Sequence, residues 1–388
     1  MKSIFYNKIY EPFHLHNDLE IEEALQTLEI EVKSFNASLL WEPEEVKKSD
    51  GSIYKVFTPF YRNGCISAKK PRELIPKPSG MNIIYDTDNK TKIDDLELLP
   101  KIKWYKEIEA IWEVGEEAAQ NKLYYFLDNN ILGYKEKRNY PHLPNTSKLS
   151  PYLHFGEISP NQIYYAAQLA LERLPKASAD IDCFLSEIGW REFSYYLLFH
   201  FPELPNKNYQ NSFDNFPWKY HAALFKAWSK GMTGYPIVDA GMRELYRTGY
   251  MHNRVRMIVA SFLVKNLMID WRYGAGWFSE HLLDADLASN SASWQWVAGS
   301  GADAAPYFRI FNPILQGEKF DPNGKYTKNF VPELQNLPSK YLFKPWEASE
   351  EILKTAGVIL GVNYPKPIVD INSSRKQALA AYAQYIKK

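Results

Sequence analysis

The pattern of apolar and polar positions begins with a short mixed segment. Residues 3–6 and 30–35 read as short strands, and the pattern over residues 18–28 predicts a helix between them. Together they form one βαβ-like unit. Such a unit cannot complete a parallel sheet, because both faces and at least one edge stay open. We therefore expect that part of an α/β domain is missing in front of it.

A long irregular segment and then a helical body follow. Residues 42–103 show little sustained periodicity and contain many prolines, which predicts an extended connection across the surface. From Trp104 onward, apolar positions recur at helical spacing. The predicted fold is mainly α, with a truncated α/β remnant at residues 1–48, a connecting segment at 49–103 and a helical body at 104–388. The predicted helices of the body span residues 104–130, 159–173, 180–200, 221–229, 236–247, 252–268, 275–296 and 373–387.

The composition is that of an ordinary globular protein. The 388 residues are 45% hydrophobic and 24% charged, and the longest apolar run, residues 257–264, is far shorter than the roughly 20 residues of a membrane helix. Cys65 and Cys183 are far apart and form no C-x-x-C motif, which favours reduced thiols and a cytoplasmic location. Because 46 basic residues balance 46 acidic ones, a polyanionic partner would need a local basic patch.

Residues 284–296 carry the strongest indication of chemistry. If this stretch is helical, Asp286, Asn290, Ser293 and Trp294 share one face, since they stand at i, i+4, i+7 and i+8. A carboxylate, an amide and an indole on one face are suited to holding a planar redox ring. The alternative is an amphipathic surface helix with a chance pair of tryptophans.

Three other segments combine charged groups with hydroxyl or aromatic groups. Residues 146–150 offer hydroxyl and backbone N–H groups to a phosphate, with Lys148 as counter-charge, or else simply begin a capped helix. Two predicted helical faces mix polar and stacking groups, and the alternative for each is an ordinary surface face. Arg254 is expected to point away from the second face, toward a phosphate. The faces are Glu187, Trp190, Arg191 and Ser194, and Asn253, Arg256 and Met257.

Several common catalytic and metal-binding patterns are absent from the sequence. It contains no P-loop, nucleophile elbow or HExxH motif. Residues 299–304 match G-x-G-x-x-A, but they follow a helical pattern and Pro306 interrupts any helix that should begin there. His14 and His16 have no cluster of carboxylates or thiols nearby, so we expect no metal site.

Taken together, six segments resemble the DNA photolyase and cryptochrome family. Their co-occurrence in this order is specific, and the resemblance covers essentially the whole chain from Phe5 onward. It is strongest to the bacterial class I cyclobutane-pyrimidine-dimer photolyases, relative to which most of the N-terminal α/β domain is expected to be missing. The segments are residues 146–150, 190–193, 233–239, 251–257, 284–296 and 307–313.

The resemblance implies that the helical body binds FAD, with Asn290 beside the flavin N5 atom. An amide at this position suits the reduced ring and favours repair of DNA over signalling. The implied FAD contacts are Tyr134, Thr146, Ser147, Lys148, Leu149, Ser150, Phe184, Arg191, Asp284, Ala285, Asp286 and Asn290.

The implied reaction is that of a deoxyribodipyrimidine photo-lyase. Excited, reduced and anionic FAD passes an electron to a cyclobutane pyrimidine dimer in DNA, the ring opens and the electron returns. The dimer is flipped out of the duplex between Trp190 and Trp296, where Glu187, Asn253 and Met257 touch it and Glu187 donates a hydrogen bond. The resemblance also implies DNA contacts by Arg138, Arg254, Arg309 and Gln316, and flavin photoreduction through Trp294, Trp271 and Trp218.

The chain departs from the family pattern at several positions. Lys148 replaces the usual Arg, Tyr250 replaces a Trp, and residues 291–293 are Ser-Ala-Ser where Asn-Gly-Gly is commoner. Phe13 and His14 stand where folate-binding members often carry Asn and Glu. These two residues and the missing front argue against a folate or deazaflavin antenna.

Two alternative functions stay open, a cryptochrome-like light sensor that binds FAD without repair and an inactive truncated photolyase. A six-four photolyase is disfavoured, because Asn253 and Met257 stand where that subfamily carries histidines. We expect a monomer that binds damaged DNA, with a separate α/β polypeptide as a candidate for the missing half.

Overall fold

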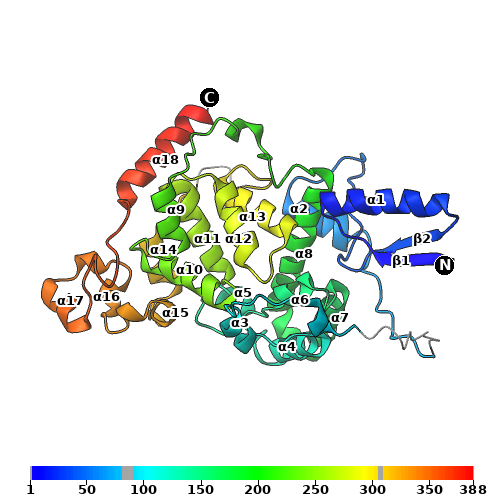
Figure 1. Ribbon diagram of the computed structural model, residues 1–388, viewed down its shortest axis with the longest axis horizontal. Helices are drawn as coiled ribbons and strands as arrows, with labels where there is room; N and C mark the ends of the chain where they lie inside the picture. Colours follow the sequence, from blue (N-terminus) through cyan, green and yellow to red (C-terminus); the bar gives the residue numbers. More distant parts are fainter. Residues whose placement is uncertain (1, 81–90, 305–308, 388) are drawn as a thin grey trace.

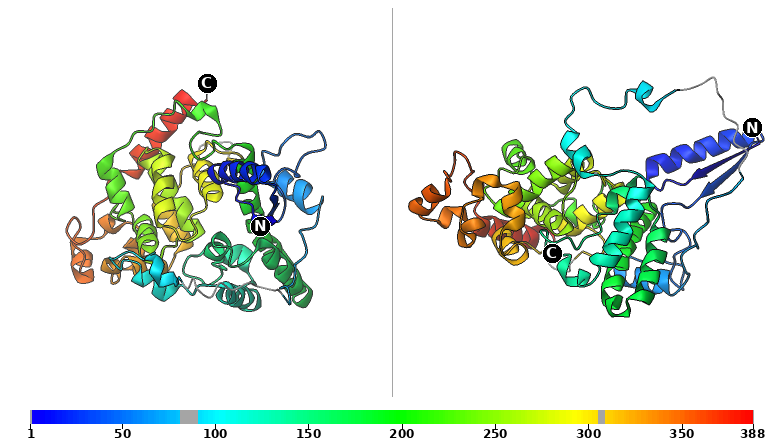
Figure 2. Two further views of the ribbon diagram at one scale, coloured as in Figure 1. Left: turned by 45° about the vertical axis from the view of Figure 1, so that its right-hand side comes forward. Right: turned by 90° about the horizontal axis from the view of Figure 1, so that it is seen from below.

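A small α/β unit projects from one end of a large helical body (Figure 1). The structure is a computed structural model that describes residues 2–80, 91–304 and 309–387. A view turned by 90° shows the same separation, with the N-terminus at the far end of the projecting unit (Figure 2). The predicted fold, mainly α with a small α/β unit at its N-terminal end, is confirmed.

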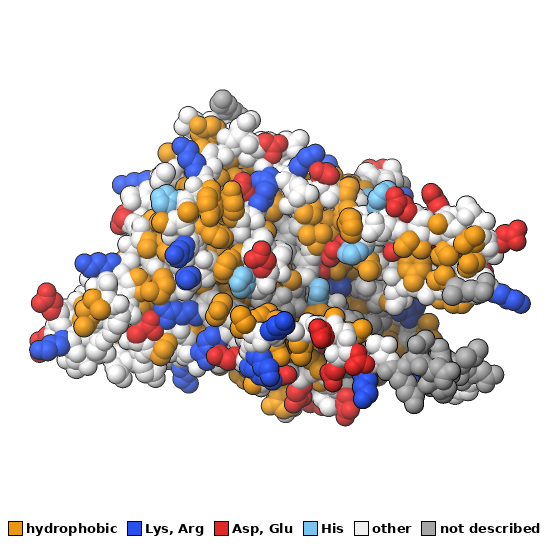
Figure 3. All heavy atoms as spheres, viewed as in Figure 1, with side chains coloured by type: hydrophobic (Ala, Val, Ile, Leu, Met, Phe, Trp, Pro, Cys, Tyr) orange, Lys and Arg blue, Asp and Glu red, His pale blue; other side chains and the backbone are white. Residues whose placement is uncertain are grey.

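The projecting unit consists of two parallel strands joined by one helix, as the sequence predicts. All five residues of β1 (Ser3–Asn7) pair with β2 (Glu31–Phe35), and α1 (Pro12–Thr27) connects them. Helix α1 begins before the predicted start at residue 18, because a proline at the first helical position already has the φ angle that a helix needs. No residue of α1 is buried, and apolar side chains gather on the face of this unit seen in Figure 3.

Several side chains in the first half of the connecting segment are buried among otherwise exposed residues, so the prediction of a connection that runs only across the surface is wrong. Phe57 is 8% exposed and Phe60 is 2% exposed, and both belong to the core that includes α8 (Ser178–His200). The segment lacks periodicity because single aromatic side chains anchor it, whereas a repeating face would give a regular pattern. The carboxylate of Glu192 in α8 accepts hydrogen bonds from the backbone N–H groups of Leu40 (2.8 Å) and Trp41 (3.3 Å). The segment contains α2 (Phe57–Pro59), a π-helix (Phe60–Ile66) and a 3-10 helix (Ile93–Leu96).

The helical body contains two large apolar cores. Its remaining helices are α3 (Lys106–Ile111), α4 (Glu116–Asn129), α5 (Tyr134–Lys137), α6 (Ser150–His154), α7 (Pro160–Arg173), α9 (Ala222–Ser229), α10 (Pro236–Thr248), α11 (Asn253–Ser261) with a π-helix (Phe262–Asn266), α12 (Trp271–His281), α13 (Leu287–Ala298), α14 (Pro313–Phe320), α15 (Lys325–Phe330), α16 (Ser339–Leu342), α17 (Glu350–Ala356) and α18 (Ile371–Tyr385). Short 3-10 helices span Pro175–Ala177, Asn211–Phe213, Pro332–Leu334 and Pro345–Glu347. One core lies around α4, α7 and α8, and the other around α10, α11 and α12. Helix α13 packs against α8, α11 and α12 and therefore joins the two cores.

Two predicted helices are broken in the structure. Residues 104–130 form α3 and α4, with a break at which Gly115 adopts a φ of 102° that favours glycine. Residues 275–296 are interrupted between α12 and α13. The helices from α14 to α17 are not predicted, because each is too short to reveal a helical period.

The described residues contain neither a membrane-spanning helix nor a cluster of metal-binding side chains. Within residues 2–80, 91–304 and 309–387, no helix is long and apolar enough to cross a membrane. In the same ranges, no group of three or more His, Cys, Asp or Glu side chains is arranged to hold a metal ion.

Candidate functional site

A cavity of about 520 Å³ lies among α8, α11, α12 and α13. Its volume is in the range of about 300–1,000 Å³ that is usual for cofactor sites. Many predicted site residues from distant parts of the chain meet here, so the fold brings them together. They are Arg138, Ser150, Glu187, Trp190, Arg191, Asn253, Arg254, Met257, Asp284, Ala285, Asp286, Asn290, Trp294 and Trp296.

Helix α8 turns one predicted face toward the cavity. Glu187, Trp190, Arg191 and Ser194 all line it, because side chains three, four and seven positions apart share a helical face. Glu187 pairs with Arg138 at 2.5 Å, and both side chains are partly buried. The alternative of an ordinary solvated surface face is therefore excluded for this helix.

The first turn of α11 also contributes to the cavity. Arg254 lines it together with Asn253, Arg256 and Met257, so the prediction that Arg254 points away from the other three is wrong. Its long side chain reaches the cavity from the helix end, where the guanidinium donates a hydrogen bond to the side-chain oxygen of Asn139 at 2.6 Å.

Arg256 and Asp284 form a shielded ion pair in the cavity wall. One guanidinium nitrogen lies 2.8 and 3.0 Å from the two carboxylate oxygens, and the Asp284 side chain is only 4% exposed. Burial by itself lowers the pKa of Arg256, but the Asp284 carboxylate outweighs it and the net shift is upward. Arg256 is absent from the predicted contacts, because 28 residues separate it from Asp284 and no local pattern links them.

Asp286 caps α13 and thereby ends the predicted continuous helix. Its carboxylate accepts a hydrogen bond from the backbone N–H of Ser289 at 2.5 Å, and the Tyr195 hydroxyl donates to the same carboxylate. The prediction of one helix over residues 275–296 is therefore wrong. The cap nevertheless leaves Asp286 and Asn290 on the wall of the same cavity.

The amide of Asn290 has a defined orientation. Its nitrogen donates to the backbone carbonyl of Ala275 (2.9 Å) and to the hydroxyl of Ser279 (3.0 Å). Both N–H groups are then in use, so the side-chain carbonyl oxygen is the group that can accept a hydrogen bond from a ligand.

The three tryptophans of the predicted relay differ in their burial. Trp294 lines the cavity and is 2% exposed. Trp271 is completely buried and donates its indole N–H to Asn208 at 3.0 Å. Trp218 is partly exposed and donates to the Val264 carbonyl at 3.1 Å.

His252 contributes a buried polar group without a partner. Its Nδ1 atom accepts a hydrogen bond from the Arg254 backbone N–H at 3.2 Å, so the proton of the neutral ring is on Nε2. Among the described residues, Nε2 has no hydrogen-bond partner. Burial and the charges of Arg138, Arg254 and Arg256 lower the pKa of His252 to about 3, so the ring is neutral at pH 7. His252 lies between the lining residues Met251 and Asn253 in the sequence but is not itself part of the cavity lining.

Other predicted contacts are outside the cavity lining. Tyr134 and Phe184 pack against each other in the core, with ring centroids 5.7 Å apart. Lys148 has a left-handed φ of 51°, and its ammonium lies 5.6 Å from the Tyr250 ring centroid. These residues stay predictions, and Tyr307 and Phe308 of the last motif lie outside the described residues. The full set outside the lining is Tyr134, Thr146, Ser147, Lys148, Leu149, Phe184, Arg309 and Gln316.

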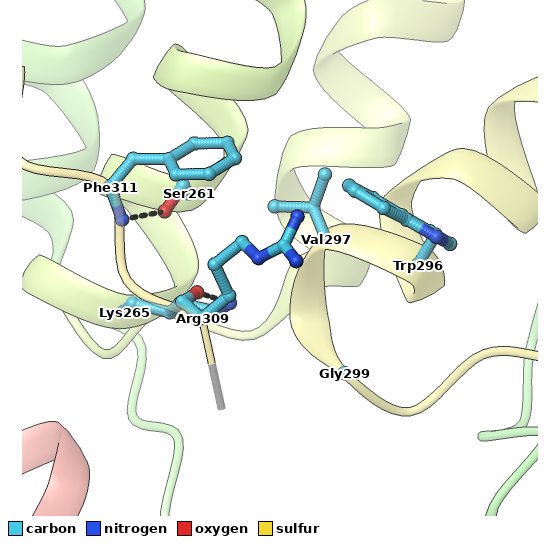
Figure 4. Close-up of a pocket in the computed structure, with 7 residues that line it drawn as sticks. All are labelled: Ser261, Lys265, Trp296, Val297, Gly299, Arg309 and Phe311. Carbon is cyan, nitrogen blue, oxygen red and sulfur yellow. Dashed lines mark hydrogen bonds between the residues drawn. The ribbon is translucent and has the colours of Figure 1, made fainter. Parts of the chain in front are cut away.

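A second cavity of about 20 Å³ adjoins the first at Trp296. The Arg309 side chain extends here toward Val297 and Trp296, and the Lys265 ammonium donates to the Arg309 carbonyl (Figure 4). Burial and the nearby Arg309 lower the pKa of Lys265 to about 7. The space is sufficient for about one water molecule, so it is too small for a cofactor.

The fold and the site together define a helical cofactor-binding protein with an α/β unit at its N-terminal end. Residues 184–384 match the FAD binding domain of DNA photolyase, and residues 1–79 match DNA photolyase. The chain is 50% identical over 382 residues to a deoxyribodipyrimidine photo-lyase of Agrobacterium fabrum, which covers 98% of this chain and 79% of that protein. It is 37% identical over 385 residues to cryptochrome-2 of Arabidopsis thaliana, with 96% of this chain and 62% of that protein covered.

Solved structures give the same result. A bacterial class III photolyase from Agrobacterium tumefaciens matches with a TM-score of 0.89 and 48% identity, covering 100% of this chain and 80% of that one. A cryptochrome of Synechocystis matches with a TM-score of 0.84 and 33% identity, covering 98% and 79%. The chain therefore belongs to the DNA photolyase and cryptochrome family, as its motifs predict. The Agrobacterium structure is of a class III enzyme, whereas the motifs favoured class I.

Proposed function

We propose that this protein is a deoxyribodipyrimidine photo-lyase that uses light to split cyclobutane pyrimidine dimers in DNA. The observation that carries the proposal is the large cavity, in which the oriented amide of Asn290 occurs together with Trp190 and Trp296. Bound FAD in its reduced, anionic state would supply the electron that opens the dimer and would recover it afterwards.

The residues around the cavity fit FAD. The Asn290 carbonyl oxygen can accept a hydrogen bond from the N5–H of the reduced ring, which favours that redox state. The Arg256–Asp284 pair offers fixed charges to the polar edge of a flavin. The other proposed FAD contacts are Tyr134, Ser150, Phe184, Arg191, Ala285, Asp286 and residues 146–149.

The same cavity can receive a flipped pyrimidine dimer. Trp190 and Trp296 offer aromatic faces, and stacking of this kind offsets part of the few kcal/mol that flipping costs. Glu187, which forms an ion pair with Arg138, is the proposed hydrogen-bonding group for the lesion, and Asn253 and Met257 are further proposed contacts of the lesion.

Local cations allow a chain without net charge to bind DNA. Arg138 and Arg254 line the cavity, and Arg309 and Gln316 are further proposed DNA contacts. Because phosphate binding releases counterions, affinity for DNA should fall as salt increases. Trp294, Trp271 and Trp218 are the proposed path for photoreduction of oxidised flavin, in order from the cavity toward the more exposed indole.

The test is repair of a defined substrate. The purified protein, loaded with FAD and reduced, is mixed with an oligonucleotide that contains one thymine dimer and is exposed to blue or near-ultraviolet light. We expect loss of the dimer in light and no loss in the dark. Absence of repair by a fully loaded, reduced preparation would contradict the proposal.

A cryptochrome-like light sensor is the second candidate. It is supported by 37% identity to a plant cryptochrome and by the match to a cryptochrome structure. A sensor would bind FAD and photoreduce it but leave the dimer intact, so the same assay separates the two functions. A preparation that binds no added FAD would instead point to an inactive protein.

The proposal includes a cytoplasmic monomer. Cys65 and Cys183 are both free thiols, which is compatible with a reducing compartment. The projecting unit exposes Phe5 (59%), Phe13 (70%) and Leu28 (67%), and the open strands beside them would accept further α/β structure, as from a separate polypeptide. Size-exclusion chromatography with light scattering would show a single copy of the chain if the monomer is correct.

A further inference from the structure

The connecting segment places an aromatic ring directly against Trp190. The rings of Phe57 and Trp190 are 3.8 Å apart and nearly parallel, at 12°. Phe57 is itself stacked with Tyr61, at 5.5 Å and 11°. Gly189 allows this arrangement, because a Cβ atom there would lie only 2.5 Å from the Tyr61 ring. One face of Trp190 is thus covered by the segment that precedes the helical body.

A hydrogen bond ties Phe57 to the loop after α13. The backbone N–H of Phe57 donates to a carboxylate oxygen of Asp303 at 3.1 Å, across 246 positions of sequence. Asp303 has a left-handed φ of 52°, which asparagine and glycine tolerate best among the possible replacements. The loop is held in turn, because the Gly301 backbone N–H donates to the carbonyl of Gln295 at 3.0 Å.

A continuous series of contacts therefore connects the two tryptophans of the cavity. Trp296 lies in α13 next to Gln295, whose carbonyl accepts the hydrogen bond from the loop after α13. Trp190 packs against Phe57, whose backbone N–H donates to Asp303 in the same loop. An indole that is already held in place loses less conformational freedom when a base stacks on it, so the entropic cost of binding the base is lower.

We propose that Phe57 is a positioning residue for the lesion, and that Asp303 anchors it. Stacking on Phe57 fixes the orientation of the Trp190 ring, and the hydrogen bond from Phe57 to Asp303 fixes the position of that ring relative to Trp296. This inference rests on the proposed function, since it assigns Trp190 and Trp296 to the flipped dimer. Phe57 of the connecting segment would then belong to the lesion-binding machinery without touching the lesion.

The test compares two pairs of variants. Phe57→Leu removes the stacked ring, and Phe60→Leu removes a buried ring of the same segment that contacts Phe193 and Tyr196. Asp303→Gly removes the acceptor and tolerates the left-handed backbone, while Asp303→Asn keeps both an acceptor oxygen and that tolerance. The measurements are FAD content, affinity for dimer-containing and undamaged DNA, and the fluorine NMR signal of Trp190 in 5-fluorotryptophan-labelled protein, assigned by its loss in Trp190→Phe.

We expect Phe57→Leu and Asp303→Gly to weaken dimer binding by about two- to tenfold and to shift or broaden the Trp190 signal. Phe60→Leu and Asp303→Asn should resemble the wild type in both measurements. An unchanged Trp190 signal and unchanged preference for the dimer in both test variants would overturn the inference. If Phe57→Leu no longer binds FAD, its weaker dimer binding cannot be assigned to Trp190, and the result for Asp303→Gly then decides whether the inference holds. A wild-type protein with no preference for the dimer would refute the proposed function, while the NMR signal would still report whether Phe57 positions Trp190.

Discussion

Truncation of Trp296 tests the proposed lesion site most directly. Trp296 is partly exposed and lines the large cavity, and its replacement by Ala would remove the indole that α13 presents there. Stacking on an aromatic ring is worth about 1–3 kcal/mol per base. Trp190 remains in place, so only one of two stacking surfaces is lost. About 2 kcal/mol corresponds to a loss of roughly 30-fold in affinity for the dimer.

The assay separates lesion binding from general DNA binding. Titrations by fluorescence anisotropy at one fixed salt concentration would compare oligonucleotides with and without a dimer. Affinity for undamaged DNA should change by less than about twofold, because phosphate contacts supply most of it. Flavin absorbance relative to protein absorbance should stay the same. Trp104→Ala is the matched control, since Trp104 is 66% exposed and is not part of the cavity. Equal discrimination by Trp296→Ala and wild type would refute the stacking role.

Three further predictions concern the cavity and the connection behind it. Asp284→Ala leaves the Arg256 guanidinium without its carboxylate, so we expect the free energy of unfolding to fall by about 3 kcal/mol and FAD to be retained less well. Urea unfolding and flavin release measure these two effects, and unchanged values would contradict the role of the pair. Burial raises the pKa of Glu192 to about 7 from 4.5, so the native state holds the proton more tightly than the unfolded state and wild-type stability should fall as pH rises from 4.5 to 7. Glu192→Gln should remove about 3 kcal/mol of that pH dependence in urea titrations, and parallel curves for the two proteins would refute this. Asn290→Leu should keep FAD but lower its two-electron midpoint potential by about 30 mV, because a hydrogen bond to the reduced ring worth about 1.4 kcal/mol is lost; spectroelectrochemistry with an unchanged potential would exclude that contact.

Much of the site was accessible from local sequence patterns. The spacing of Glu187, Trp190 and Arg191 predicts one face of a helix, and α8 turns that face to the cavity. Asp286 shows that local patterns can miss the point at which a helix begins. Its side chain caps α13 where apolar periodicity predicts a continuous helix, and a cap depends on backbone geometry that periodicity does not report.

The connecting segment shows that burial, too, can be missed when it is predicted from sequence patterns. Prolines and missing periodicity predict a surface path for residues 42–103, yet Phe57 and Phe60 are buried in the core that includes α8. Each buried ring is an isolated anchor in irregular backbone, so no repeating pattern marks it. Burial here results from the shape of the neighbouring helix, which the segment's own residues do not encode.

The sequence by itself determined the helical body, the faces of its longer helices and the family to which the chain belongs. Those properties depend on neighbours three or four positions apart or on contiguous motifs, and both are visible in one dimension. The tertiary structure alone decided that Arg256 meets Asp284 across 28 positions and that Phe57 is anchored by Asp303 across 246. Such pairs form only where packed helices bring distant backbone together, because their free energy comes from burial and geometry that no local pattern records.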